Sequence, residues 1–563
     1  MLLSYWINKI QVLLAPILAG LFSLLLVALT YRYGWWPIDE SVFAHMAERV
    51  AKGEVYGVEV HDFHGGYHTY LNAWLFKVFG FDMAVLRYPF FVISSIQAAL
   101  AAYLLRRSGF WISFLGGLSM TTLTFMLFPN PSPNWFALFF AVVIVFILTE
   151  WEWKPSTLLI AGVVWGLAFM FRHPSAAFLL LGVVAYAIHR QQIINDSDNE
   201  RKYSIHHLVL FGMAMFILAY SYIVFEWFGF LLFGLPALLI TGLMASRRYS
   251  QWRQLFLDGF WFGTGAAVAI FPMVIFQLLH GDVLLWMKNS FFAGLSMPDM
   301  EFFTSYSYLG FFIDTTISIP IPMSLTLALY YLVRCLVPVL LVGIVAYLWL
   351  KDKDSNLPPV VLMAPFYALV SFYFQIEFYF FVGFPLLLLA FLILIGKTGR
   401  ILNIVIIAGL IHLQVSALFW NAPSVSAIRF PDLYVNSDLS RASLVITGEV
   451  KERYQTTLKI IESHTEVGDV IYAFPFSPEY YFLSERVNYS DEIGTSFAVT
   501  SDEDFQNLLN DLDEVQPAMM IFASDNFYAS EYDWLLLEKL LSDPNYELVA
   551  NERLTYFFAR TDR

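Results

Sequence analysis

Apolar runs of about 15 to 27 residues recur along the first three quarters of this chain. Runs of this length, with few charges, predict helices that cross a membrane. Thirteen segments fit: 12–30, 83–105, 110–128, 134–149, 157–171, 175–189, 207–225, 228–245, 256–279, 326–350, 358–376, 378–395 and 401–420. The pattern predicts a polytopic α-helical membrane domain over residues 1–420, with about 13 transmembrane helices.

The remaining segment, 421–563, alternates strand and helix patterns. Strands are expected at 468–474 and 517–524, helices at 478–486 and 533–541, and a hairpin or two strands at 546–560. This alternation predicts a small soluble α/β domain. The segment lacks a G-x-G-x-x-G or P-loop sequence, so a nucleotide site is not expected there.

Basic residues in short loops predict the orientation of the helices. With the N-terminus in the cytoplasm, every predicted inside loop contains Lys or Arg. These residues are Arg106 and Arg107, Lys154, Arg190, Arg201 and Lys202, Arg247 and Arg248, Lys351 and Lys353, Lys397 and Arg400. The long loops 31–82 and 280–325 and the segment 421–563 then lie outside. We expect an integral protein of a bacterial inner membrane, with its C-terminal domain in the periplasm.

Composition supports this class and excludes some functions. The chain is 58% hydrophobic and 14% charged, against about 25% charged residues in soluble domains. The net charge of −14 comes from residues 431–563, which hold 25 acidic and 9 basic residues. This acidity argues against nucleic-acid binding. The single cysteine, Cys335, excludes a disulfide within the chain and a zinc–thiolate site.

The first outside loop opens with two adjacent acids, Asp39 and Glu40. Apolar residues then recur with helical spacing from Val42 to Val50, and Gly53 follows, so a short amphipathic helix at the membrane interface is expected. At the start of such a helix, Asp39 is suited to capping the backbone N–H groups. It is equally suited to acid–base chemistry, and both roles remain open at this stage.

Further along this loop, His61, Asp62, His64 and His68 fall within eight residues, although the chain has only 11 His. Imidazole and carboxylate groups suit divalent cations such as Zn²⁺, Mn²⁺ or Mg²⁺, so Asp62, His64 and His68 are candidate metal ligands. The alternative is that they are polar loop residues at a wet interface.

The order of these motifs resembles the GT-C superfamily of lipid-dependent glycosyltransferases. It is most similar to the branch that contains the protein O-mannosyltransferases and the lipid A aminoarabinose transferases. Members carry an Asp-Glu pair after the first span, then a stretch like D-V-H-P-P-L-G-K-L-L, which DFHGGYHTYL (62–71) resembles in Asp62, His64 and Leu71. Glycines stand at 65–66 in place of the prolines, and Thr69 in place of a lysine.

A second stretch, GLAFMFRHPSAAFLLL (166–181), resembles the family run G-L-A-F-L-T-K-G-P, with Arg172 in place of the lysine. Predicted topology alone also puts Arg172 on the outside face, where a cation suits a lipid phosphate or snorkels to the headgroups. A third, weaker match is EFYFFVGFP (377–385), which keeps Tyr379 and Pro385 but has Glu377 where the family has a basic residue.

The resemblance implies transfer of a sugar from a polyprenyl-phosphate donor to a glycan, lipid or protein acceptor outside the cell, with inversion. In this reading Asp39 is the general base, and Glu40 and Asp62 orient the acceptor or a metal. The expected substrate or phosphate contacts are His64, Tyr67, His68, Arg172, His173, Lys288 and Arg334. Membrane lipids are the surrounding partner. The alternatives are a transporter or flippase of lipid-linked sugars and a non-catalytic membrane scaffold.

Overall fold

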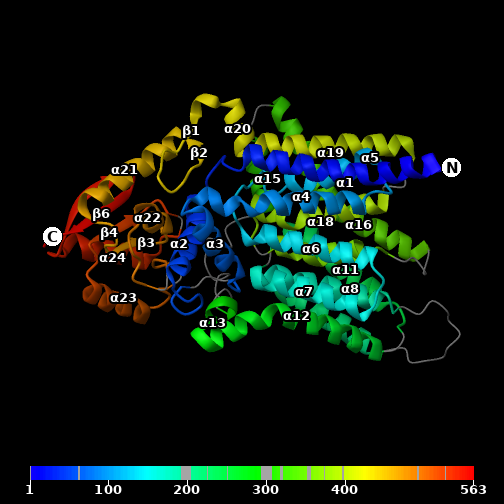
Figure 1. The fold of residues 1–563 in the computed structure, drawn as a ribbon, viewed down its shortest axis with the longest axis horizontal. Helices are drawn as coiled ribbons and strands as arrows, with labels where there is room; N and C mark the ends of the chain where they lie inside the picture. The colour runs from blue at the N-terminus through cyan, green and yellow to red at the C-terminus, as the bar shows by residue number, and fades with distance from the viewer. Residues whose placement is uncertain are drawn as a thin grey trace.

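The computed structural model describes residues 2–60, 64–191, 204–224, 226–249, 252–292, 307–317, 321–351, 357–372, 374–395, 399–490, 493–496, 498–526 and 528–562. A bundle of long helices forms one end of the molecule, and a small α/β domain forms the other (Figure 1). Two short helices, α2 (Pro37–Lys52) and α3 (Tyr67–Phe79), lie between them and run across the direction of the bundle helices.

The bundle contains the predicted membrane spans. Its helices are α1 (Leu2–Thr30), α4 (Pro89–Leu104), α5 (Phe110–Thr122), α6 (Pro133–Glu150), α7 (Pro155–Phe171), α8 (His173–His189), α9 (Ile205–Ile223), α11 (Leu235–Ala245), α12 (Trp252–His280), α16 (Ile321–Lys351), α17 (Pro359–Tyr367), α18 (Glu377–Ile395) and α19 (Arg400–Asn421). Among the described residues, nine helices are long and apolar enough to cross a membrane, and three more apolar helices are shorter. The prediction of a polytopic α-helical membrane protein is confirmed; α5, with 13 residues, belongs to neither of these two groups.

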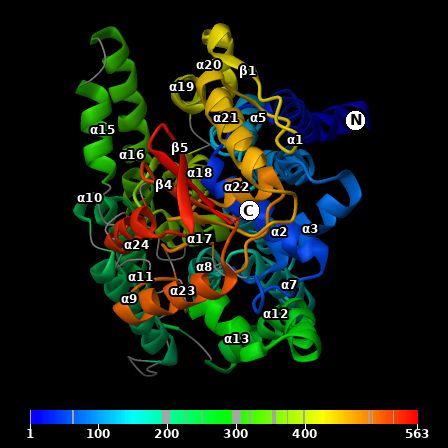
Figure 2. The same ribbon diagram turned by 90° about the vertical axis from the view of Figure 1, so that its left-hand side faces the viewer.

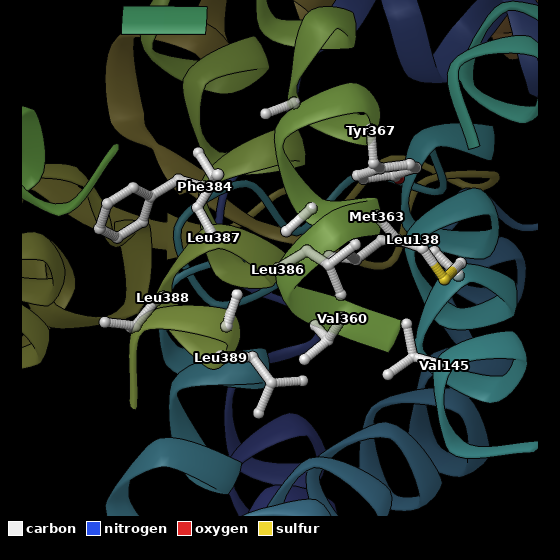
Figure 3. Close-up of a cluster of buried hydrophobic side chains, with 14 of the residues drawn as sticks. Leu138, Val145, Val360, Met363, Tyr367, Phe384, Leu386, Leu387, Leu388 and Leu389 are labelled. Atoms are coloured by element: carbon white, nitrogen blue, oxygen red, sulfur yellow. The ribbon is translucent and has the colours of Figure 1, made fainter. Parts of the chain in front are cut away.

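The core of the bundle surrounds α18. Residues 380–390 of this helix are all buried, as expected for a helix that is apolar on every side. Leu386 lies beside Val360 and Met363 of α17, and the same buried cluster includes Leu387–Leu389 of α18 and Leu138 and Val145 of α6 (Figure 3). The central position of α18 fixes the start of the helix, where Glu377 and Tyr379 lie.

Short elements line the end of the bundle that faces the α/β domain. They are η1 (Met83–Arg87), α13 (Val283–Met287), η3 (Lys288–Phe292), α15 (Tyr308–Ile317), η5 (Ala368–Ser371) and α20 (Pro423–Arg429). At another position along the chain, α10 (Trp227–Gly229) and η2 (Phe230–Gly234) lead into α11.

The α/β domain is built on a four-stranded sheet of order β3-β4-β6-β5. β3 (Ile471–Phe474) and β4 (Met519–Ala523) are parallel, whereas β6 (Thr555–Arg560) is antiparallel to both β4 and β5 (Tyr546–Glu552). The helices are α21 (Gly448–His464), α22 (Pro478–Ser484), α23 (Asp502–Val515) and α24 (Glu531–Ser542), and β1 (Tyr434–Asn436) pairs with β2 (Val445–Thr447). The strands and helices predicted for this segment are confirmed; α21 and α23 were not predicted.

The α/β domain packs on α2 and α3 (Figures 1 and 2). The ring of Tyr481 stacks on His45, with centroids 5.0 Å apart, and Phe482 stacks on Phe76 at 5.6 Å. Buried residues of α2, α3 and the domain form one continuous apolar cluster. The helix that carries Asp39 is therefore held between the bundle and the domain.

Glu479 of α22 gives the domain a pH-dependent stability. It is 4% exposed, and burial raises its pKa from the ordinary 4.5 to about 7. A carboxyl whose pKa is higher in the folded state binds more protons when folded, so stability falls as pH rises from 4.5 to 7 and is level above that. We expect this group to contribute a fall of about 3 kcal/mol in unfolding free energy.

Unfolding of the full-length protein in detergent between pH 4.5 and 8 measures this fall, and Glu479→Gln is expected to reduce it. The wild-type minus variant difference isolates Glu479, because burial also raises the pKa of Asp533. Parallel curves for the two proteins would contradict the assignment.

Candidate functional site

Asp39 lies in the first turn of α2. The helix starts at Pro37, whose ring suits the first helical position, and Trp36 precedes it. The Asp39 side chain is exposed and forms no hydrogen bond or ion pair with the described residues. Enough protein surrounds it, however, that desolvation raises its pKa to about 6. Asp39 thus has the accessibility and the pKa of a general base that works near neutral pH.

The neighbouring acid, Glu40, is fully buried and has a different role. Its carboxylate accepts a hydrogen bond from the backbone N–H of Trp36, the residue before the helix, at 3.1 Å. It also forms a two-pronged ion pair with Arg87 of η1, with Nη2–Oε1 at 2.6 Å and Nε–Oε2 at 3.1 Å. Neither acid caps the first turn through its side chain. Glu40 is occupied by Arg87 and positions the helix, and its predicted part in orienting an acceptor stays a prediction.

Arg87 extends this contact to the loop before α2. Its Nη1 donates to the Tyr31 carbonyl at 2.6 Å, and its Nη2 to the Gly34 carbonyl at 2.9 Å. The end of α1, the start of α2 and η1 are thereby held by one guanidinium. Because the loop and the first turn are both fixed, the backbone position from which the Asp39 side chain projects is fixed as well.

Phe43 connects Asp39 to the histidine motif. It lies one turn after Asp39, so the two side chains share a face of α2. The Phe43 ring packs on His68, with centroids 4.8 Å apart, and lies 6.4 Å from the His64 ring. The face of α2 that carries Asp39 is thus directed toward His64.

Arg172 lies between α7 and α8, at the same end of the bundle. Its Nη1 donates to Nε2 of His64 at 2.9 Å, and its Nη2 donates to the Tyr379 hydroxyl at 3.1 Å. Its buried Nε has no acceptor among the described residues, and none of their carboxylates pairs with it. Because a guanidinium only donates, Nε2 of His64 is unprotonated. Arg172 is therefore a half-buried cation with no described counter-charge, which suits an anionic ligand.

Two glycines bring His64 to Arg172. A Cβ on Gly65 would lie 2.7 Å from the Met170 carbonyl oxygen, and Gly66 has φ +105° with the Tyr56 ring in the way of any Cβ. The Tyr56 hydroxyl also donates to the His64 carbonyl at 2.7 Å. The close approach to the end of α7 explains why glycines occupy these positions.

The predicted metal ligands do not gather among the described residues. His64 precedes α3, so it does not share a helix face with His68. Nε2 of His68 lies 2.6 Å from the Pro131 carbonyl oxygen, and it must donate there, which disagrees with ligation through that atom. Asp62 lies outside the described residues, in which no group of three metal-binding side chains occurs.

Three other predicted contacts have these surroundings. The Tyr67 hydroxyl donates to the Ala269 carbonyl at 2.7 Å, so it ties α3 to α12. The His173 ring packs against Phe291, with centroids 5.1 Å apart. Lys288, in η3, is exposed.

Arg334 is not a free phosphate ligand, in contrast to its prediction. It is 2% exposed, and its Nη1 lies 2.9 Å from both carboxylate oxygens of Glu377. The Tyr331 hydroxyl donates to the same carboxylate at 2.9 Å, and the Phe380 ring covers the guanidinium at 3.8 Å. This buried pair anchors the start of α18, two residues before Tyr379.

Sequence reasoning missed Arg87 and gave Tyr379 no role. Arg87 lies at the start of a predicted span, where a charge is costly without a partner, and that cost was the available signal. Tyr379 was visible in the EFYFFVGFP stretch, but its contact with Arg172 joins positions 207 residues apart.

Among the comparisons with known proteins, matches came from solved structures and not from family models or curated proteins. No protein-family model matches the chain, and no curated protein matches it. Two solved structures of ArnT from Cupriavidus metallidurans are similar, each at a TM-score of 0.42. The form bound to undecaprenyl phosphate is 14% identical and covers 96% of both chains; the apo form is 13% identical and covers 99% of this chain and 98% of that one. Similarity at this level does not show what the present chain does.

Replacing Arg87 tests the structural role of the buried pair. Arg87→Ala leaves Glu40 as an unpaired buried charge and is expected to lower the unfolding free energy by about 3–5 kcal/mol. The double variant Glu40→Gln/Arg87→Met, which removes both charges, should be less destabilised than Arg87→Ala. Thermal unfolding of the purified protein measures both, and equal stability of Arg87→Ala and wild type would contradict the role.

Proposed function

We propose that this chain is a membrane glycosyltransferase, which moves a sugar from a polyprenyl-phosphate donor to an acceptor at the extracytoplasmic face. The proposal includes an N-terminus in the cytoplasm, a membrane domain over 1–420 and a periplasmic domain over 421–563. The acceptor class is a glycan, a lipid or a protein, and the donor reaches the site laterally through the membrane.

One observation carries the proposal. At the end of the bundle that faces the α/β domain, Asp39 and Arg172 are left without counter-charges among the described residues, while Glu40 and Arg334 each form an ion pair. Arg172 is half-buried and desolvation raises the pKa of Asp39, and unpaired groups with such surroundings are often retained where a ligand or a reaction uses them. A base and an anion-binding cation are the two groups that displacement at a phosphate-linked carbon needs.

The reaction would proceed as one displacement. Asp39 takes the proton from the acceptor hydroxyl as its oxygen forms a bond to C1 of the sugar. The bond between C1 and the phosphate oxygen breaks, and its electron pair leaves with the polyprenyl phosphate. Attack opposite the leaving group inverts the configuration at C1. The negative charge that develops on the phosphate is stabilised by Arg172.

Tyr379 and His64 hold the guanidinium of Arg172 in position through one hydrogen bond each. The Tyr379 oxygen accepts a hydrogen bond from Arg172, so its own proton is available for a phosphate oxygen. His64 holds the other side of the guanidinium through Nε2. The exposed Lys288 is a further candidate contact for the phosphate, and Asp62 remains proposed as an orienting residue.

No step is assigned to a metal ion. If a divalent cation were bound by Asp62, His64 and His68 together, His68 would bind it through Nδ1, because its Nε2 lies 2.6 Å from the Pro131 carbonyl oxygen. A cation at this site would supply additional stabilisation of the phosphate, and the residues described above act without it.

The alternatives make different demands on the same residues. A transporter or flippase predicts unpaired charges along a path through the membrane, whereas the buried Arg334 of α16 is neutralised by Glu377. A scaffold predicts that Asp39 is dispensable. The raised pKa and accessibility of Asp39 favour the enzyme.

Asp39→Asn tests the base. We expect transfer to fall by at least about 10²-fold, because a positioned base contributes about 10²–10⁴. Wild-type kcat/KM should fall as pH drops below about 6, where Asp39 takes up its proton. The assay uses membranes supplied with a polyprenyl-phosphate sugar, with the exposed Asp432→Asn as control. Full activity in Asp39→Asn would remove Asp39 from the mechanism.

Arg172→Ala tests the phosphate contact. It should lower transfer strongly and weaken binding of polyprenyl phosphate itself, while Arg172→Lys keeps part of both because it keeps the charge. The exposed Arg107→Ala, at a predicted cytoplasmic loop, serves as control. Unchanged binding of polyprenyl phosphate to Arg172→Ala would overturn this assignment without touching that of Asp39.

A further inference from the structure

A second polar region lies where α2 meets the α/β domain, and we call it the α2–α22 seam. The membrane side contributes Trp35, Ser41 and His45, and the domain side contributes Tyr454, Ser477 and Glu479. The Trp35 and Tyr454 rings lie 4.5 Å apart, and the Tyr454 hydroxyl donates to Glu479 Oε1 at 3.4 Å. These residues are separate from the face of α2 that carries Asp39 and Phe43.

Polar atoms on both sides of the seam are buried without partners among the described residues. On the membrane side they are Nε1 of Trp35, Oγ of Ser41 and Nε2 of His45; on the domain side they are Oγ of Ser477 and Oε2 of Glu479. Ser41 and Ser477 are 0% exposed, and His45 and Glu479 are 4% exposed. Buried polar groups are nearly always hydrogen-bonded, so five orphans at one interface indicate that something else satisfies them.

The seam is fastened on both sides of the unmatched groups. Toward the C-terminal end of α2, Glu48 forms an ion pair with Arg441 at 2.9 Å, and Arg49 donates to the Ser490 carbonyl at 2.6 Å. In the loop before α2, Arg32 Nε donates to the Ser443 carbonyl at 2.8 Å, and the Gly34 N–H donates to the Val445 carbonyl at 2.9 Å. The unmatched groups lie between these two sets of contacts.

The chemistry of the seam suits an uncharged ligand rich in hydroxyl groups. Hydroxyl, indole, imidazole and carboxyl groups supply both donors and acceptors, and the rings of Trp35, Tyr454 and Tyr481 supply flat apolar faces. The cations Arg49, Lys52 and Arg441 act on His45, and Arg453 acts on Glu479, which disfavours a positively charged ligand. The Glu479 carboxyl beside Asp525 disfavours an anionic one. Sugar rings combine hydroxyl edges with apolar faces, and ligand sites are common at domain interfaces.

We propose that the α2–α22 seam is a binding subsite for an uncharged sugar unit, seated between Trp35 and Ser41 of the membrane domain and Ser477 and Glu479 of the α/β domain. Resting on the proposed function, this sugar belongs to the acceptor, so the acceptor is a glycan or a glycan-bearing molecule.

The test uses full-length protein in detergent and an array of uncharged and charged oligosaccharides. Wild type should retain uncharged glycans, and Ser41→Ala, Ser477→Ala and Trp35→Phe should each bind them about tenfold more weakly, the effect of losing one hydrogen bond. Each variant removes an orphan polar atom, so its melting temperature without ligand should not fall. Ser463→Ala, an exposed serine bonded to its own helix, is the matched control.

Retention of no uncharged glycan by wild type overturns the proposal, as does equal retention by wild type and the three variants. A fall in melting temperature of the two serine variants without ligand would show that the orphan hydroxyls hold the two faces together, and it also counts against the subsite. Asp39→Asn separates this proposal from the enzymatic one: it should lose transfer but keep glycan binding. Seam binding with undiminished transfer in Asp39→Asn would overturn the mechanism and leave the subsite standing.

Discussion

The buried ion pair between Glu40 and Arg87 is the contact on which the candidate site depends. Both side chains are 0% exposed, and their two hydrogen bonds are accompanied by bonds from Arg87 to the carbonyls of Tyr31 and Gly34. A buried pair of this kind adds little stability relative to apolar packing, but it permits one arrangement only. Here that arrangement defines how the chain leaves α1 and enters α2, and so where Asp39 projects. The Glu40–Arg87 pair therefore contributes mainly by fixing the backbone at Asp39, and less by adding stability.

A second buried ion pair, between Arg334 and Glu377, fixes the backbone near a residue that contacts the cation Arg172. Arg334 and Glu377 hold the start of α18, two residues before the Tyr379 that contacts Arg172. The charges that set the geometry are thus matched, and the charges next to them, Asp39 and Arg172, are not. This division follows from electrostatics: a paired carboxylate already has its hydrogen bonds taken by the counter-charge, whereas an unpaired one is free to accept a proton from another molecule. The same logic separates Arg172 from Arg334, although both are arginines near the same end of the bundle.

Sequence patterns predicted most of the fold and part of the site. Hydropathy located the helices of the bundle because lipid demands long apolar runs, and strand–helix alternation located β3, α22, β4 and α24. The sequence left capping and acid–base chemistry open for Asp39, because adjacent helical residues differ by about 100° in direction and only the long-range contact between Glu40 and Arg87 separates the two acids. Arg334 was read as a ligand because its partner lies 43 residues away in sequence. Local sequence therefore indicated which side chains are ionisable, while long-range pairing decided which of them are available.

The position of α2 joins the two halves of the molecule. Its N-terminal turn is set by the bundle through Arg87, its C-terminal half is fastened to the α/β domain through Glu48, and the Tyr481 ring stacks on its middle at His45. The loop before α2 is bonded to the same domain, because Arg32 Nε donates to the Ser443 carbonyl at 2.8 Å and the Gly34 N–H donates to the Val445 carbonyl at 2.9 Å. The turn that carries Asp39 is therefore held by the bundle and by the α/β domain together, so a displacement of the domain would also act on the position of Asp39.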